Sequence, residues 1–231
     1  MKDYSPERLD PNQDDNLSRI AAHQYRYDFA KNLLSQENRE LKILDIACGV
    51  GYGSDTLSKI PNSKVYGVDI SNEAVKTAKS RYNKENTTFQ TGSLTEIPFE
   101  DGFFDAVVCF ETIEHIMSGD TNKALSEINR VLNKSGLLII STPNKLVEDI
   151  AKYIFRIDNK YHSNELSYKL LKDELVRCGF EILDSFGQGL LLLPLYPLVK
   201  CKMFPTWYFK PSNLLPPSVS MFMVVSCKKN Q

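Results

Sequence analysis

The sequence predicts an α/β fold in which helices cover both faces of a mostly parallel, doubly wound sheet. Short apolar runs of strand length alternate with helical patterns between residues 41 and 141. Strands that alternate with helices imply right-handed crossovers and a parallel sheet. The runs at 106–110 and 137–140 are continuously apolar, which is typical of strands buried on both faces. The 231 residues suffice for one such domain with an addition.

The expected elements follow one another in a regular order. Apolar residues at helical spacing predict a helix over 17–34, after a polar arm. We expect strands at 41–47, 64–68, 87–90, 104–110 and 136–141, with helices after Gly51, after Ser71 and over 121–132. Beyond Ser163 we expect a helix to about Cys178, a strand at 180–185 and a last strand at 221–227.

A hydrophobic insertion at 186–219 is long for a loop in a compact domain. It is rich in leucine and proline and contains the aromatic residues Phe204, Trp207, Tyr208 and Phe209. Three interpretations stay open: a flap that completes the core, a lid over a substrate, or a contact between two copies of the chain.

Composition limits the class of protein. The apolar fraction is 42%, the charged fraction 25% and the net charge −1, so nothing in the charge balance attracts nucleic acid. The five cysteines are scattered without the spacing of a zinc site, and we predict no metal. No secretory signal is visible, and the apolar stretch 190–199 is too short for a bilayer. We therefore expect a cytoplasmic protein without a membrane span.

A glycine-rich turn follows the first predicted strand, and an acid follows the second. Gly49 and Gly51 let the backbone turn tightly and approach a ligand closely, and Asp69 lies about twenty residues further on. A carboxylate at this place accepts hydrogen bonds from ribose hydroxyls. The alternatives are a tight turn without ligand and a carboxylate that interacts with a helix dipole. Two ligands compete, a nicotinamide dinucleotide and S-adenosylmethionine; the dinucleotide pattern would end at Ser54.

Five segments, in order, resemble the motifs of class I S-adenosylmethionine-dependent methyltransferases. They are LDIACGVGYG at 44–53, VYGVDIS at 65–71, TGSLTEIPF at 91–99, FDAVVCFETIEHI at 104–116 and KSGLLIISTP at 134–143. Together they cover about residues 40–143. The resemblance implies a Rossmann-like sheet of seven strands with the last one antiparallel. It also implies one domain over 1–231, with an N-terminal arm and helix (1–40), a cofactor-binding core (41–143) and an acceptor side (144–231).

The resemblance implies roles for individual residues around the cofactor. Ala47 stands where the family commonly has its first glycine, and Ser93 where many relatives have an aspartate that reaches the adenine amino group. We expect the carbonyl of Phe110 to accept from the cofactor's amino group, and Tyr27 or Arg26 to bind its carboxylate. The full predicted cofactor set is Tyr27, Asp45, Ala47, Cys48, Gly49, Gly51, Tyr52, Asp69, Ile70, Ser93, Leu94 and Phe110.

Methyl transfer to a hydroxyl requires that the acceptor lose a proton, and the histidines are candidate bases for this step. His115 follows the fourth strand, in the loop over the methyl group in the resembled family, and Glu111 could orient it or bind a polar acceptor. His162 is the second candidate, and His23 could touch the ligand. The alternatives are a loop-packing residue for His115, a surface residue for His162 and a helix-packing residue for His23.

The predicted function is methyl transfer from S-adenosylmethionine, with S-adenosylhomocysteine as product, to a small polar acceptor. The nearest resemblance is to bacterial small-molecule methyltransferases of cell-surface sugar and quinone biosynthesis. We therefore expect an oxygen of a sugar, nucleotide-sugar or phosphorylated metabolite in surface-polysaccharide biosynthesis. Three alternatives remain: an N-methyltransferase, an NAD(P)-dependent oxidoreductase, and a catalytically silent subunit that binds the cofactor. A homodimer is also compatible with the sequence.

Overall fold

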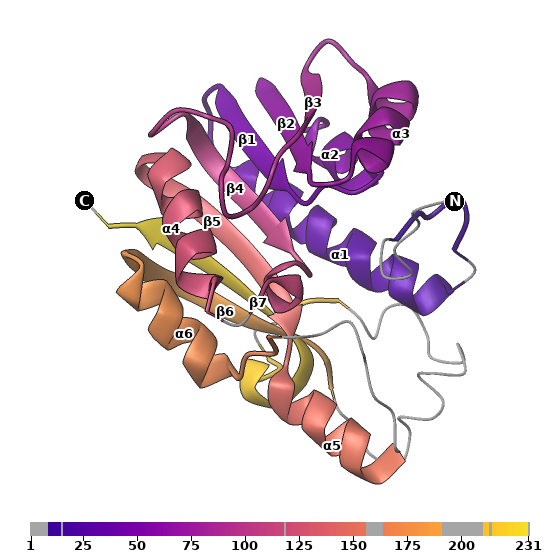
Figure 1. Ribbon diagram of the computed structural model, residues 1–231, viewed down its shortest axis with the longest axis vertical. Coiled ribbons are helices and arrows are strands. Elements are labelled where there is room, and N and C mark those ends of the chain that lie inside the picture. The colour runs from indigo at the N-terminus through magenta and orange to yellow at the C-terminus, as the bar shows by residue number, and fades with distance from the viewer. Residues whose placement is uncertain are drawn as a thin grey trace.

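A computed structural model of the protein describes residues 9–14, 16–117, 119–155, 164–190, 210–212 and 214–230. One seven-stranded sheet forms the centre of the molecule (Figure 1). Its order is β3-β2-β1-β4-β5-β7-β6. The strands are β1 (Leu41–Ile46), β2 (Ser63–Asp69), β3 (Thr87–Thr91), β4 (Phe104–Phe110), β5 (Leu132–Pro143), β6 (Phe180–Leu190) and β7 (Ser220–Lys229).

Strands β1 to β5 pair in parallel, whereas β7 pairs antiparallel with both β5 and β6. This arrangement confirms the prediction of a mostly parallel, Rossmann-like sheet of seven strands. Because β1 and β4 are neighbours while their connections run to opposite sides, the sheet has a switch point between them, where α/β folds commonly bind ligands.

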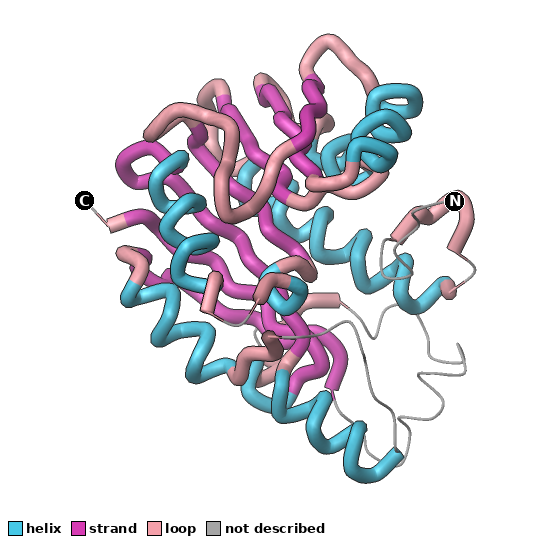
Figure 2. Tube along the Cα trace, viewed as in Figure 1, coloured by secondary structure: helices cyan, strands magenta, loops and turns pink. Residues whose placement is uncertain are grey.

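Helices cover both faces of the sheet (Figure 2). They are α1 (Leu17–Leu34), α2 (Tyr52–Leu57), α3 (Asn72–Tyr82), α4 (Thr121–Val131), α5 (Lys145–Phe155) and α6 (Tyr168–Arg177). Side-chain caps fix three helix starts. Asn16 accepts from the amide of Arg19 before α1. Ser71 accepts from the amide of Ala74 before α3, and Ser167 accepts from that of Leu170 before α6.

The core consists of two main layers because alternate strand residues point to opposite faces. Ile43 and Val108 pack with α1 and α2, whereas Leu44 and Val107 pack with α4 and α6. Both faces of the central strands are thus buried, which explains their continuously apolar sequences. In the described part of the chain no helix is long and apolar enough to cross a lipid bilayer.

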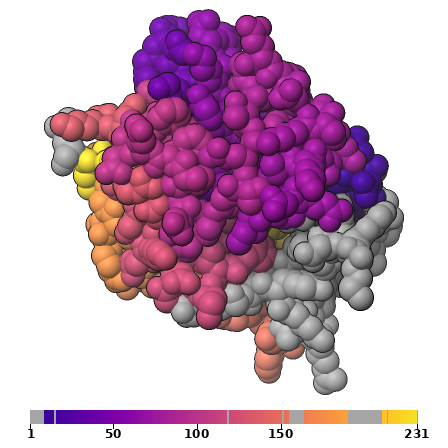
Figure 3. All heavy atoms as spheres, turned by 45° about the horizontal axis from the view of Figure 1, so that its top comes forward, coloured from indigo at the N-terminus to yellow at the C-terminus, as the bar shows by residue number. Residues whose placement is uncertain are grey.

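The structure corrects several predicted bounds. α5 was not predicted, and its end projects from the edge of the molecule (Figure 3). The helix expected after Ser163 begins at Tyr168, behind the Ser167 cap. β5 begins at Leu132 rather than at 136, with Ser135 in the left-handed region (φ 67°). β6 continues to Leu190 because it pairs with β7 along its whole length, so the start of the predicted insertion is strand. Residues 191–209, and the four aromatic residues singled out there, lie outside the described residues.

Candidate functional site

The turn after β1 is left-handed at three positions. Ala47 has φ 60°, Gly49 φ 56° and Gly51 φ 91°. A Cβ on Gly51 would lie 2.8 Å from the Cβ of Ala78, so glycine is required there by space as well as by conformation. The amide of Cys48 donates to the carbonyl of Val68 at 3.0 Å, which joins the turn to the end of β2.

Asp69 ends β2 directly beside this turn. Its Oδ2 accepts from the amide of Gly49 at 2.8 Å, and its Oδ1 accepts from the amide of Ser71 at 2.9 Å. The side chain is therefore fixed in orientation. Each carboxylate oxygen can accept a further hydrogen bond, and Asp69 contributes to a cavity wall.

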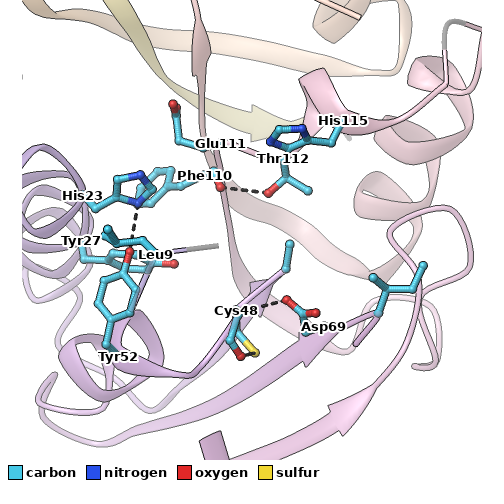
Figure 4. A pocket seen from close by; sticks show the side chains of 13 residues that line it. Leu9, His23, Tyr27, Cys48, Tyr52, Asp69, Phe110, Glu111, Thr112 and His115 are labelled. Carbon is cyan, nitrogen blue, oxygen red and sulfur yellow. Dashed lines mark hydrogen bonds between the residues drawn. The ribbon is translucent and has the colours of Figure 1, made fainter. Parts of the chain in front are cut away.

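A cavity of about 380 Å³ lies at the carboxyl ends of β1, β2 and β4 (Figure 4). This volume lies within the ~300–1,000 Å³ of typical small-molecule sites. Two carboxylates, Asp69 and Glu111, contribute to the wall, and none of the described lining residues is lysine or arginine. The lining residues are Leu9, His23, Tyr27, Ala47, Cys48, Gly49, Tyr52, Asp69, Ile70, Phe110, Glu111, Thr112 and His115.

Helix α1 covers one side of the cavity through Tyr27. The ring packs directly on Gly53, where an added Cβ would lie 2.0 Å from the ring carbon Cζ. Its edge meets the rings of Tyr52 and Phe110, with centroids 5.6 and 5.1 Å away. On the same side, Nδ1 of His23 lies 2.9 Å from the hydroxyl of Tyr52. Burial, and the positive charge of neighbouring arginines, lower the pKa of His23, which favours neutral imidazole.

Asp45 lies beneath the turn rather than in the cavity wall. It is fully buried and accepts from the hydroxyl of Tyr27 at 3.0 Å and from Oγ of Ser54 at 2.6 Å. Burial raises its pKa to about 7, despite these two hydrogen bonds. Its side chain therefore connects α1 to α2 from below, and any contact with a ligand would be indirect.

The loop after β4 supplies the opposite wall. Glu111 has φ 50°, an unusual conformation for a residue with a side chain, and such strain is common at functional sites. Oγ of Ser141 donates to its Oε1 at 2.8 Å, and Nη2 of the buried Arg26 lies 3.8 Å from its Oε2. The hydroxyl of Thr112 donates to the carbonyl of Phe110 at 2.9 Å. Glu111 is thus held in place, and it contributes to the cavity wall.

His115 stands at the mouth of the cavity, with its side chain 34% exposed. Its Nε2 lies 3.9 Å from Oε1 of Glu114, which is buried and accepts from the hydroxyl of Thr142 at 2.9 Å. Burial and the neighbouring Glu111 raise the pKa of Glu114. The Glu114 side chain therefore lies behind the imidazole ring and limits its orientation.

The structure brings together most of the residues predicted from sequence. Of the predicted cofactor set, Tyr27, Ala47, Cys48, Gly49, Tyr52, Asp69, Ile70 and Phe110 contribute to the cavity wall, together with Glu111 and His115. Gly51, Leu94 and Ser93 are not in that wall. The hydroxyl of Ser93 lies 3.0 Å from that of Thr95 and accepts from the Thr95 amide.

Other predicted residues lie elsewhere. Arg26, considered for the cofactor's carboxylate, is fully buried, donates to Oε1 of Gln188 at 2.5 Å and is not among the described residues of the cavity wall. His162 lies outside the described residues. Sequence reasoning missed Leu9, which comes from the arm before α1 and carries no motif, and it gave Thr112 no role although the β4 motif contains it.

A parallel sheet with a left-handed glycine turn after β1 and a fixed carboxylate at the end of β2 defines an α/β domain that binds a nucleoside-containing cofactor. Comparison with known proteins shows what this domain is similar to. Residues 44–140 match the family model described as a methyltransferase domain. This part of the chain is thus similar to S-adenosylmethionine-dependent methyltransferases, the activity for which the first relatives below are named.

Individual relatives agree with this family. A probable S-adenosylmethionine-dependent methyltransferase of Mycolicibacterium smegmatis is 32% identical over 145 residues, which cover 63% of this chain and 54% of the relative. An O-methyltransferase of Penicillium expansum is 28% identical over 172 residues, covering 71% and 59%. The chain thus spans about half the length of curated relatives it matches. The YcgJ protein of Bacillus subtilis has the same fold, with a TM-score of 0.65 at 18% identity over 90% of this chain and 100% of that one.

Proposed function

We propose that the protein transfers a methyl group from S-adenosylmethionine, bound in the cavity at the ends of β1, β2 and β4, to a small polar acceptor. The observation that carries this proposal is the fixed carboxylate of Asp69, which lies in one cavity with the backbone of Gly49 and Phe110. The relatives named as S-adenosylmethionine-dependent methyltransferases support it.

The residues present fit this cofactor. Gly49 brings bare backbone to the cavity, so a ligand can approach without meeting a Cβ. Asp69 offers lone pairs to a pair of hydroxyls, and the two carboxylates in the wall suit a ligand that carries a positive sulfonium.

When bound, the cofactor supplies an electrophilic methyl group. Alignment of the acceptor with the reacting atoms lowers the barrier, and the loop after β4 has the groups to provide it. Glu111, fixed by Ser141, accepts a hydrogen bond from an acceptor hydroxyl or amine. His115 takes the acceptor's proton, and the Glu114 side chain behind it limits the orientation of the ring.

For the acceptor we propose an oxygen of a sugar, a nucleotide-sugar or a phosphorylated metabolite, as in bacterial surface-polysaccharide biosynthesis. The O-methyltransferase among the relatives supports an oxygen acceptor. The hydrogen-bonding character of Glu111, Thr112 and His115 supports a polar one. A cytoplasmic location and a homodimer remain predictions from the sequence.

Calorimetric titration with S-adenosylhomocysteine, NADH and NADPH tests the cofactor assignment. We expect micromolar binding of the thioether only, and a loss of at least tenfold in affinity in Asp69→Asn, because the amide replaces one acceptor oxygen by a donor. Asp28→Asn, at a half-exposed position on α1, is the matched control and should bind like wild type. Binding of a nicotinamide and not of S-adenosylhomocysteine would overturn the proposal.

A further inference from the structure

The loop between β3 and β4, residues 92–102, begins beside Asp69, a residue of the cavity wall. The amide of Gly92 donates to the carbonyl of Asp69 at 3.1 Å, so the first residue of the loop is tied to the end of β2. Leu94 and Ile97 anchor the loop by burying their side chains in the core beside α4. Further along, the loop runs beside α4 (Figure 1).

Two charged residues on α4 bind the far side of this loop. Glu127 accepts from Nε and Nη2 of Arg130, both at 2.8 Å, so the pair is bidentate. The amide of Ile97 donates to Oε2 of Glu127 at 2.9 Å. Arg130 then donates to the carbonyls of Ile97 and Phe99 at 2.9 and 2.8 Å.

Arg130 also closes the end of the loop. Its Nη1 donates to Oδ1 of Asp101 at 2.8 Å, and its own carbonyl accepts from the amide of Gly102 at 2.9 Å. The backbone hydrogen bonds within the described loop are short-range: the amide of Glu96 donates to the carbonyl of Ser93, and that of Phe99 to the carbonyl of Ile97. The path of the described loop is therefore set largely from α4, across about thirty residues of sequence.

We infer that Arg130 and Glu127 are positioning residues for the adenine end of the cofactor, acting through the backbone of residues 92–102. This inference rests on the proposed function, in which the cofactor lies in the cavity beside Asp69 and Ile70. The Ser93 side chain is engaged with Thr95, so the backbone of the loop, placed by α4, is what we propose the adenine edge to meet. Misplacement by about 1 Å is enough to break hydrogen bonds to a purine edge.

The hydrogen bonds that Arg130 makes to the loop and to Glu127 require a guanidinium group. One planar group donates at the same time to the carbonyls of Ile97 and Phe99, to the Asp101 carboxylate and to both carboxylate oxygens of Glu127. An ammonium has three donors at a single atom and cannot span these positions, so lysine is not a conservative replacement. Arg130→Lys should therefore behave like Arg130→Met, whereas a residue held only for its charge would tolerate lysine.

The test compares two ligands on the same variants. S-adenosylhomocysteine and S-inosylhomocysteine differ at the purine edge, where an oxygen replaces the adenine amino group. Calorimetry on wild type should show preference for the adenine compound. In Arg130→Met and Arg130→Lys we expect its affinity to fall at least tenfold and the ratio between the two ligands to approach one. Lys169→Met, which removes an exposed charge on α6, is the matched control.

The outcomes separate this inference from the proposed function. If wild type fails to bind S-adenosylhomocysteine, the proposed function itself is wrong. If wild type binds it but does not discriminate between the ligands, or if the Arg130 variants keep the wild-type ratio with a lower melting temperature, the residues are merely structural and the inference is overturned. If Arg130→Met does not fold, Glu127→Gln tests the inference instead, because glutamine keeps the shape of the side chain and one acceptor oxygen. We expect this variant to lose less affinity for S-adenosylhomocysteine than the Arg130 variants and to move the ratio between the ligands toward one.

Discussion

Replacing Asp45 by asparagine should stabilise the protein at alkaline pH. The carboxyl group is fully buried, and its only described hydrogen-bond partners are the hydroxyls of Tyr27 and Ser54. Asparagine has the same shape and no charge. Both hydroxyls can rotate to donate or to accept, so they can satisfy the amide as well as the carboxylate.

The magnitude follows from the pKa of Asp45, which burial raises from 3.8 to about 7. Between these two values the folded state keeps its proton while the unfolded state has lost it. The free energy of unfolding therefore falls as pH rises, by about 1.4 kcal/mol per pH unit. Over the whole window the upper limit is about 4 kcal/mol, and relaxation around the charge reduces it to about 2–4 kcal/mol.

Urea unfolding from pH 4 to pH 8, in the absence of ligand, measures this effect. We expect wild type and Asp45→Asn to be about equally stable near pH 4 and the variant to be more stable at pH 8. The raised pKa of Glu114 contributes to both proteins and cancels in the difference. Asp173→Asn, at an exposed position on α6, should show no such trend.

A pH-independent difference between wild type and Asp45→Asn would refute the reasoning. So would a variant that is less stable at pH 8. Either result would mean that Tyr27 and Ser54 keep the carboxylate ionised with an ordinary pKa, and that the charge stabilises the contact between α1 and α2.

Three further substitutions test separate features. Gly53→Ala should lower the free energy of unfolding measured in urea by about 2–3 kcal/mol, because the new Cβ would lie 2.0 Å from Tyr27 Cζ. A variant as stable as wild type would show that α1 can shift to make room. Lys229→Met should lower the free energy of unfolding by about 1–2 kcal/mol, because two hydrogen bonds to carbonyls at the end of α4 are lost. The affinity for S-adenosylhomocysteine should not change, and Lys228→Met should leave the stability unchanged. Glu111→Gln should lower the preference for S-adenosylmethionine over its thioether product about three- to tenfold by calorimetry; equal losses for both ligands would instead assign Glu111 to the shared amino group.

The sequence is most informative where one local rule decides the outcome. The helix over 17–34 and the strand over 104–110 were predicted with their observed bounds, because the first has apolar residues at helical spacing and the second is a largely apolar run of strand length. The extension of β6 to Leu190 escaped prediction, since it depends on pairing with β7. α5 escaped too, although its sequence is strongly amphipathic and could have predicted it.

The site shows the same division. The glycine turn and Asp69 are a local signature, and the structure brings them into one cavity. What the sequence does not contain is side-chain direction. Asp45 points away from the cavity to Tyr27, eighteen positions earlier, and Arg26 pairs with Gln188, 162 positions later. Such pairs depend on tertiary packing, and no motif spacing encodes them.

The position of β7 has a consequence for the order in which the chain can assemble during synthesis. β7 comes last among the strands, yet it lies between β5 and β6 and supplies the pairing partner of both. While the ribosome is still adding residues 220–229, β5 therefore has an open edge and β6 has no neighbour in the sheet. An unpaired edge beside apolar residues such as Ile139 and Ile140 is a site for aggregation. We expect slow translation of the last strand to lower the yield of folded protein.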